Sequence, residues 1–567
     1  TFACTDAGAA CATAVLDYDT NSGVPYALNQ SCTLSGANPD YVATCALSNL
    51  SAGTTYFVRS RATDGAGNSA NGTENYATTT SVTTEYFSQT GTGNIPCTLA
   101  NPCPIDTGQS RDLLHRAAPG VNLVIVNGTH AINSRIEINC ANGVSPGNAQ
   151  SVITLRAQTE RGAILDISGM TSGNTAIRFT SCSYWTVEGL VFKGRNPASD
   201  VSEPWLDSSL ILSASSHITV RRNVFSHTNR FNNNHLLGIY NTSSSTVEEN
   251  EFYYFHRYAI LLSSDTHDNV IKRNYGNPRG WDSNQPGEYC YSPPTSGCHG
   301  SLINLYGGSG RIYNNKVLNN IGEDSPIWVY ADADTNSYYG NIVFGTGNYN
   351  DPGLGWGYPG GTNVCSETPN GNTFENNLAY ATTSTPIRVS LDGHNNFVSR
   401  NFSIIGGTVC FGDNCSRTTS VQFINTVQMG NGSGTGFSEG NIDSWSNNYV
   451  DTRAMTTDFS PDDGNTTNRI PLSSNPLLTC RVFVPTAATQ IKGQGLGGAD
   501  IGANILYAYN DNLSLSITKL WSSSTKKWNT ALKGATVNIT GLDTRTNSLA
   551  DVEARLHPSC TAWPAGY

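Results

Sequence analysis

An apolar residue followed three positions later by Asn recurs between residues 220 and 450. In eight copies the first position holds Val, Ile, Tyr, Phe or Trp, and in five of them another apolar residue stands two places after the Asn. The Asn positions are Asn223, Asn250, Asn274, Asn315, Asn341, Asn377, Asn401 and Asn448. The shortest steps run from 24 residues (250 to 274) to 27 residues (223 to 250). The pattern therefore indicates a structural repeat, with loop insertions where the steps are longer.

The repeat lacks the 3.6-residue period of a helix and fits a short strand, a tight Asn turn and a second strand in each coil. Strands stacked in this way form a parallel β-helix, in which Asn side chains hydrogen-bond along the turns and apolar residues stack inside. We predict an all-β protein with a parallel β-helix over residues 85–505. Its Asn ladder is expected to include Asn223, Asn250, Asn274, Asn315 and Asn341.

Three strand-like segments, 85–91, 152–157 and 185–192, resemble the first coils of the pectate-lyase-like family of right-handed parallel β-helices. The Gly-rich segment 495–502 resembles the end of such helices. The resemblance implies a right-handed coil and many relatives that cleave or bind polysaccharide. It is specific for fold and weak for activity.

Residues 1–84 show a different pattern. An alternating strand from Tyr56 to Ala62 runs into the turn Gly65–Asn68, and this resembles the E–F corner of a fibronectin type III sandwich. The chain before Leu50 has room for about three strands, so the first strand of this Ig/fibronectin-like sandwich is expected to be missing. Either an upstream segment was left out, or a neighbouring copy donates the strand.

The last residues, 506–567, are predicted to be a tail with strand-like pieces at 515–518 and 536–540. They could cap the open end of the β-helix or complete the sandwich of another copy. A disulfide between Cys480 and Cys560 would hold the tail in place.

Composition narrows the partners and the compartment. The net charge is −11 and the pI is near 5.4, which argues against nucleic acid as a partner and requires a local basic groove for any acidic polysaccharide. Fifteen cysteines without zinc-ribbon spacing favour disulfides in an extracellular or cell-surface protein, with one thiol left over. The close pairs are Cys4 with Cys11, Cys32 with Cys45, Cys97 with Cys103, Cys290 with Cys298 and Cys410 with Cys415. No apolar run is long enough for a membrane span.

A basic ladder is one candidate for catalysis. Arg230 and Arg257 each follow a ladder Asn by seven residues, so they should stack on neighbouring coils. His256 precedes Arg257, and Lys272 belongs to the next coil. Such a row could hold the carboxylates of an acidic sugar during β-elimination. Alternatively, the row only supports the coils, with Asp265 and Asp268 as partners.

Other candidates concern binding. Asp332 and Asp334 alternate in a turn and are candidate Ca²⁺ ligands, although acidic turn residues often have no ligand. Trp281, Tyr289 and Trp356 lie in long insertions, where they could stack on sugar rings or fix the loop. The paired-carboxylate pattern of the polygalacturonases of this fold is not present.

Three functions remain. The favoured one is a secreted structural or adhesive protein that assembles with copies of itself into filaments by strand donation to the sandwich. The first alternative is a polysaccharide lyase that acts on acidic glycans. The second is a carbohydrate-binding surface protein without catalysis.

Overall fold

The structure is a computed structural model of the 567-residue chain. It describes residues 2–4, 10–37, 40–47, 50, 54–78, 83–93, 95–105, 113–170, 174–194, 206–226, 235–255, 258–278, 300–307, 310–323, 325–329, 333–345, 354–356, 370–381, 387–390, 398–405, 407–410, 421–429, 442–446, 449–450, 495–499, 502–503, 520–522 and 527–529.

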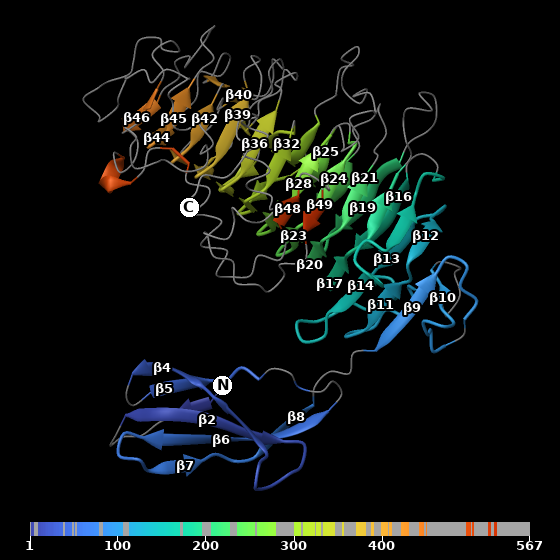
Figure 1. The fold of residues 1–567 in the computed structure, drawn as a ribbon, viewed down its shortest axis with the longest axis vertical. Coiled ribbons are helices and arrows are strands. Elements are labelled where there is room, and N and C mark those ends of the chain that lie inside the picture. Colours follow the sequence, from blue (N-terminus) through green and yellow to red (C-terminus); the bar gives the residue numbers. More distant parts are fainter. Residues whose placement is uncertain are drawn as a thin grey trace.

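The first strands form two antiparallel sheets (blue in Figure 1). One has the order β1 (Phe2–Cys4), β5 (Asp40–Thr44), β4 (Thr33–Ala37). The other joins β3 (Leu28–Ser31), β2 (Cys11–Asp19) and β6 (Thr55–Asp64), with β7 (Ser69–Asn71) and β8 (Asn75–Thr78) both paired to β6. The sheets place Tyr56 in a buried position beside Tyr18. The likeness to a fibronectin type III domain stays a prediction.

From β9 onward the chain forms a parallel β-helix, as predicted (Figure 1). Its longest sheet has fourteen strands. They are β10 (Cys103–Pro104), β9 (Thr84–Ser88), β11 (Asn122–Ile125), β14 (Ile153–Ala157), β17 (Ser183–Glu188), β20 (Ser216–Arg221), β23 (Thr246–Glu248), β27 (Val270–Lys272), β31 (Lys316–Leu318), β35 (Ser337–Tyr339), β38 (Thr373–Glu375), β41 (Val398–Arg400), β44 (Val421–Ile424) and β46 (Ile442–Ser446).

The second sheet has twelve strands. They are β12 (Gly128–Ala131), β15 (Ala163–Asp166), β18 (Val191–Lys193), β21 (Val224–Ser226), β24 (Glu251–Tyr253), β28 (Tyr275–Asn277), β32 (Ile321–Glu323), β36 (Ile342–Gly345), β39 (Leu378–Ala381), β42 (Ser403–Ile405), β45 (Val427–Met429) and β47 (Tyr449–Val450).

The third sheet has eight strands. They are β13 (Ile136–Asn139), β16 (Asn174–Thr180), β19 (Leu206–Ser213), β22 (His235–Tyr240), β25 (Tyr258–Ser263), β29 (Ser301–Tyr306), β33 (Ile327–Val329) and β37 (Leu354–Trp356). Short ladders accompany the three sheets: β26 (Thr266–His267) with β30 (Ile312–Tyr313) and β34 (Ala333–Asp334), and β40 (Ile387–Ser390) with β43 (Gly407–Cys410).

The turns between the fourteen- and twelve-stranded sheets are tight because each contains a residue with a left-handed backbone conformation. Arg222, Glu249 and Arg273 occupy this position on successive coils with φ between 55° and 59°. A side chain in this conformation costs about 1–2 kcal/mol. The backbone helps to offset that cost, because the N–H of each of these residues donates to a carbonyl of the following coil, as from Arg222 to Glu248 at 3.2 Å.

The interior is apolar and stacked in columns. Phe192, Phe225 and Phe252 face inward from the twelve-stranded sheet, with ring centroids 4.7 and 5.0 Å apart and interplanar angles of 6°. Each ring is fully buried, so removal of one would leave a cavity in two neighbouring coils.

Two Asn ladders, rather than one, run along the coils. The first joins Asn223, Asn250, Asn274, Asn320, Asn341 and Asn377. The second joins Asn269, Asn315, Asn336 and Asn372. In both ladders the side-chain oxygen of one Asn accepts from the backbone N–H of the Asn on the preceding coil.

The assignment of Asn315 to the same ladder as Asn274 was therefore wrong. Asn274 bonds Asn320, while Asn315 bonds Asn269. The motif did not separate the two ladders, because each has an apolar residue three positions before its Asn: Ile312 precedes Asn315, and Val317 precedes Asn320. The two ladder Asn residues of one coil are five positions apart in sequence, so both ladders show the same spacing from one coil to the next.

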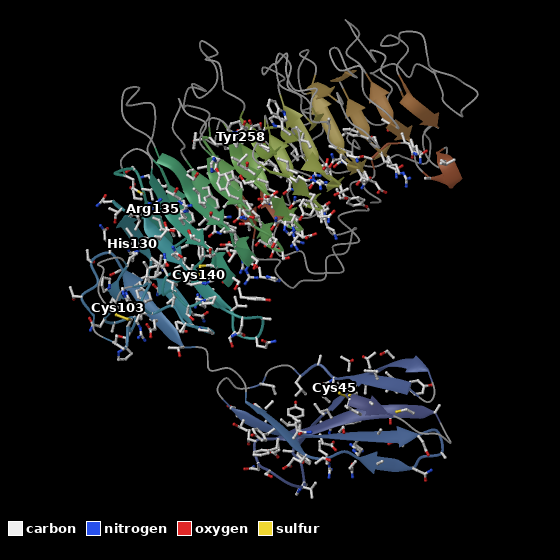
Figure 2. All side chains as sticks on the ribbon, turned by 180° about the vertical axis from the view of Figure 1, so that it is seen from behind. Cys45, Cys103, His130, Arg135, Cys140 and Tyr258 are labelled. Carbon is white, nitrogen blue, oxygen red and sulfur yellow. A yellow bond between two sulfur atoms is a disulfide. The ribbon has the colours of Figure 1, made fainter. Side chains whose placement is uncertain are left out.

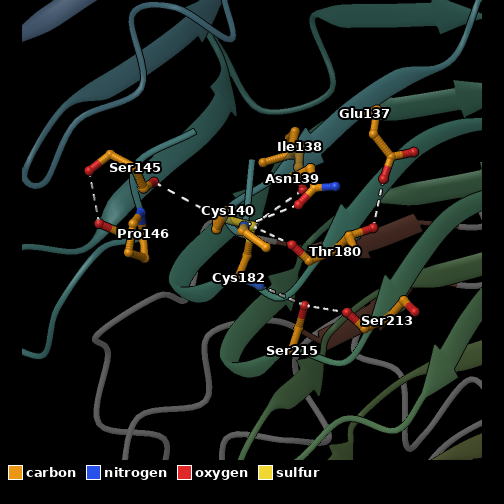
Figure 3. The surroundings of a disulfide bond; sticks show 11 residues. Glu137, Ile138, Asn139, Cys140, Ser145, Pro146, Thr180, Cys182, Ser213 and Ser215 are labelled. Atoms are coloured by element: carbon orange, nitrogen blue, oxygen red, sulfur yellow. Dashed lines mark hydrogen bonds between the residues drawn. A yellow bond between two sulfur atoms is a disulfide. The ribbon is translucent and has the colours of Figure 1, made fainter. Parts of the chain in front are cut away.

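Disulfides support the coils and the first sheets. The predicted pairs Cys32–Cys45 and Cys97–Cys103 are confirmed, and Cys11 is disulfide-bonded. A further bond, Cys140–Cys182, joins two coils with a sequence separation of 42 residues (Figure 3). Pairing of near neighbours in sequence could not reveal it. The pairs proposed for Cys290, Cys298, Cys415, Cys480 and Cys560 lie outside the described residues, as does the side chain of Cys410.

The Gly-rich segment near residue 500 returns to the coil stack. The N–H of Leu496 donates to Asn425 Oδ1 at 2.7 Å, and the N–H of Ala503 donates to Ser403 Oγ at 2.8 Å. The strands expected at 515–518 and 536–540 lie outside the described residues. Within the tail, β48 (Leu520–Ser522) and β49 (Lys527–Asn529) form an antiparallel pair.

Candidate functional site

Most of the candidate residues found from the sequence lie outside the described residues. They are Arg230, His256, Arg257, Trp281, Tyr289 and Asp332. Trp356 ends strand β37, but its side chain is not among those described. These assignments stay predictions.

Lys272 lies in an alternating row of charges on the outer face of the fourteen-stranded sheet. In register, the row runs through Arg156, Glu188, Arg221, Glu248 and Lys272. Lys272 is 3.1 Å from Glu248, and Arg221 is 2.6 Å from Glu188. The acidic partners of Lys272 and Arg221 are thus within the row, and neither Asp265 nor Asp268 serves them.

Both acidic residues of the row have two basic partners. Glu188 also pairs with Arg222 at 2.8 Å, and Glu248 also pairs with Arg273 at 3.0 Å. Burial alone would raise the pKa of Glu188, but the guanidinium groups of Arg221 and Arg222 outweigh it and hold that pKa below its ordinary value. Each carboxylate is shared by two cations, so the two acidic groups of this row are fully paired and the cations outnumber them.

The acidic turn residues also have partners. Asp334 accepts from Arg311 at 2.8 Å and from the N–H of Asn370 at 2.9 Å. Asp265 accepts from the N–H of Arg311, and Asp268 lies 2.7 Å from His267. Among the described residues, no three His, Cys, Asp or Glu side chains gather as they would around a metal ion. Asp332 lies outside the described residues, so the calcium site at Asp332 and Asp334 stays a prediction.

A buried charged cluster occupies the outer face of the twelve-stranded sheet. Arg161 pairs with Glu251, and the Tyr253 hydroxyl donates to the other oxygen of that carboxylate at 2.8 Å. Burial and the Glu251 carboxylate raise the pKa of Tyr253 well above its ordinary value, so this hydroxyl stays protonated. Arg161 comes from the turn before β15, so the cluster ties distant coils together.

The outer face of the eight-stranded sheet is different, because uncharged polar and aromatic side chains gather on it. His235 and Tyr240 belong to β22, and His235 Nε2 lies 2.9 Å from the Tyr240 hydroxyl. Gly238 lies beneath them: a Cβ atom at this position would be 2.4 Å from His235 Nε2 and 2.7 Å from the Tyr240 ring. The missing side chain at Gly238 thus makes room for the His–Tyr pair.

The next coils continue this face. Gly238 is in register with Leu261, Asn304 and Trp328. His235 is in register with Tyr258, which is labelled in Figure 2, and Tyr240 is followed in its row by Ser263 and Tyr306. Tyr306 is 45% exposed, whereas Leu261 and Trp328 are buried. The face thus combines an accessible polar row with a buried apolar one.

Asn304 is the unusual residue of the buried row. Its side chain is fully buried, yet within the described part of the chain neither its amide nitrogen nor its amide oxygen has a hydrogen-bond partner. An unsatisfied buried polar group costs about 1–3 kcal/mol. The Asn residues of the two described ladders are all hydrogen-bonded, so Asn304 differs from them and marks a position where the described structure alone does not account for the residue.

The sequence did not point to the His–Tyr pair. Alternation places residues five apart on opposite faces of a strand, which would separate His235 from Tyr240. The structure brings them together because Leu236 and Leu237 both enter the apolar core. The only available signal was the Gly in an otherwise bulky strand, since Gly in a strand often marks a close approach.

Comparisons with known proteins gave distant structural likenesses. No protein-family model and no curated protein matches the chain. The chain is similar to the PL6 family alginate lyase AlyGC, with 16% identity, a TM-score of 0.41, and coverage of 63% of this chain and 52% of that one. It therefore spans about half the length of that enzyme.

Two other solved structures are similar to a comparable extent. A PL6 alginate lyase in complex with a trisaccharide shows 15% identity and a TM-score of 0.42, over 65% of this chain and 80% of that one. The PL6 family polysaccharide lyase Pedsa3628 from Pseudopedobacter saltans shows 14% identity and a TM-score of 0.41, over 69% and 96%. A likeness of this extent says nothing about the chemistry of this chain. In the described residues, no helix has the length and apolarity to cross a membrane.

Proposed function

We propose that this chain is an extracellular polysaccharide lyase that acts on a uronate-containing glycan at the outer face of the eight-stranded sheet. The observation that carries the proposal is the His235–Tyr240 pair, held at 2.9 Å over Gly238. A positioned His–Tyr pair can take up and return a proton, which β-elimination requires. The disulfides fit an oxidising, extracellular compartment.

In this proposal Tyr240 contacts the sugar, because it is the accessible member of the pair. Its oxygen takes the proton from the carbon next to the carboxylate, while its own proton passes to His235 Nε2. The electron pair of the broken C–H bond forms the C=C bond, and the C–O bond to the leaving sugar breaks. The leaving oxygen then takes a proton back from the pair.

The test is release of unsaturated sugar from a panel of uronate polysaccharides. The native sequence should release it, Tyr240→Phe and His235→Ala should not, and His217→Ala should behave as the native protein does. His217 is the matched control, since it is exposed and stacks on Tyr184 at another corner of the coils. Lack of product from every polysaccharide, with the native protein folded, would refute the lyase. Retention on a glycan without cleavage would instead indicate a binding protein.

A second proposal, self-assembly by strand addition, rests on the first sheets. The sheet β1-β5-β4 has three strands, and β1 pairs only with β5 among the described strands. An edge strand of this kind can accept a strand from another copy. Electron microscopy of the full chain beside a version without residues 1–84 tests it: filaments that need those residues support assembly, and dispersed particles in both refute it.

A further inference from the structure

Arg178 lies unpaired on the same outer face as the His–Tyr pair. It belongs to β16, is half-buried, and lies between Glu137 and Ile211 in the sheet register. Among the described residues its guanidinium forms no ion pair, and its buried Nε has no hydrogen-bond partner. A charge removed from water without a partner is costly, so this position calls for an explanation.

The neighbouring carboxylate does not serve Arg178. Glu137 is directly opposite it in the register, but its two oxygens are used elsewhere. One accepts from the Thr180 hydroxyl at 2.6 Å, and the other pairs with Arg135 at 3.3 Å. Figure 3 shows the Glu137 carboxylate directed at Thr180, and Figure 2 labels Arg135. Because Thr180 and Arg135 occupy the two oxygens of Glu137, the guanidinium of Arg178 is available to another acceptor.

The other arginines in the described part of the coils lack this combination of burial and a missing acceptor. Ion pairs with carboxylates hold Arg116, Arg161, Arg221, Arg222, Arg273 and Arg311. Arg156 donates to the carbonyl of Ala157, and Arg400 is exposed at a later coil. Arg178 differs from these because it is both partly buried and without an acceptor in the described part of the chain.

The register places Arg178 in line with the candidate active site. Arg178, Ile211 and Gly238 are consecutive members of one outward row, so Arg178 lies two strands, about 10 Å, from the His–Tyr pair. We propose that Arg178 forms an oxyanion subsite, which binds a carboxylate or sulfate group of a glycan that crosses the coils. The inference rests on the proposed function. It adds to that function the binding of an acidic group on a sugar next to the one that is cleaved. The planar guanidinium suits such a group, because two of its N–H donors match two oxygens.

Binding measurements with defined oligosaccharides test this subsite. The probes are an alginate oligosaccharide, a sulfated dextran oligosaccharide and neutral dextran of similar length. Arg178→Gln should weaken binding of the anionic probe about 10-fold or more, and Arg178→Lys should restore part of it. Affinity for the anionic probe should also depend less on salt in Arg178→Gln. Loss with alginate alone identifies a carboxylate subsite, and loss with the sulfated probe alone identifies a sulfate subsite.

Arg400→Gln is the matched control, since it removes an exposed arginine from a different coil. The inference is overturned if Arg178→Gln binds as tightly as the native protein, if both Gln variants lose the same affinity, or if the native protein binds neither anionic probe. These results are separable from those on catalysis. If Arg178→Gln keeps its affinity while Tyr240→Phe is inactive, the subsite is refuted and the lyase proposal stands. If Arg178→Gln binds more weakly but the native protein cleaves no glycan, the lyase is refuted and the subsite stands.

Discussion

The outer faces of the fourteen-stranded and the eight-stranded sheet differ in how their polar side chains are paired. On the fourteen-stranded sheet, acidic and basic residues alternate along the register, and Glu188 and Glu248 each bind two cations. On the eight-stranded sheet, Arg178 has no acceptor and Asn304 has no partner among the described residues. The backbone is the same in both places, a parallel ladder with one strand per coil.

In a repetitive fold, the difference between paired and unpaired polar groups indicates where a functional site can be sought. A row whose carboxylates are all paired with neighbouring cations is explained by its support of the coils. A row with unsatisfied groups costs stability, and a protein retains such groups where a ligand completes them. We therefore interpret the outer face of the fourteen-stranded sheet as support for the coils, and we propose chemistry only for the outer face of the eight-stranded sheet.

The largest effect should come from the interior Asn ladder at the turn that follows the fourteen-stranded sheet. Asn274→Ala removes the acceptor of the Asn250 backbone and side-chain N–H groups and the donor to Val247. We expect a loss of about 4 kcal/mol, since several buried groups lose partners. Chemical denaturation measures it, with the exposed turn residue Asn142→Ala as control. Equal midpoints for the two variants would contradict the role of the ladder.

The next effect concerns the corner where the two faces meet. Cys140 follows β13 of the eight-stranded sheet, and Cys182 precedes β17 of the fourteen-stranded one. Replacement of both by Ser should lower stability by about 3 kcal/mol, because a long loop loses its closure. Thermal unfolding of the double variant measures this loss. Full stability without the bond would show that the ladders alone hold this corner.

Gly238→Ala tests the His235–Tyr240 contact on the outer face of the eight-stranded sheet. The added methyl group would meet His235 Nε2 at 2.4 Å, so the ring must move away from Tyr240. Because a misplaced catalytic group commonly costs about 100-fold, we expect a fall of that size in kcat with little change in KM. Circular dichroism and the denaturation midpoint check that the coils remain. Native activity in this variant would separate the His–Tyr contact from catalysis.

The smallest effect belongs to the paired face. The pKa of Glu188 is lower in the folded chain, so its contribution is present above the unfolded pKa and is lost as the pH falls through the folded value. Glu188→Gln should cost about 1–2 kcal/mol at neutral pH and less as the pH falls below the ordinary value of 4.5. Unfolding at a series of pH values tests this, with exposed Glu375→Gln as control. Altered glycan binding by Glu188→Gln would break the distinction between the faces.

The sequence predicted the repeat better than its details. The Asn and apolar positions identified the parallel β-helix because each coil must satisfy its turn and fill its interior in the same way. The ladder of Asn315 was misassigned because both Asn positions of a coil share the same local pattern. The turn residues Arg222 and Glu249 gave no signal either, since left-handed positions usually hold Gly or Asn.

The site was harder to predict than the fold. Arg178 looks like any basic strand residue until the register shows that Glu137 is already bound. Asn304 resembles a ladder residue in composition but lies outside both ladders. His235 and Tyr240 meet only because of a local departure from alternation. Such features depend on which groups find partners across coils, and spacing along the chain does not carry that information.

The most direct test of the central claim is to map where an acidic glycan binds. A photoreactive alginate oligosaccharide is added to the native protein, and the cross-linked peptides are identified by mass spectrometry. We expect cross-links in β16, β22 and β29, on the outer face of the eight-stranded sheet, and their loss in Arg178→Gln. Cross-links confined to the fourteen-stranded sheet or to residues 1–84 would contradict it.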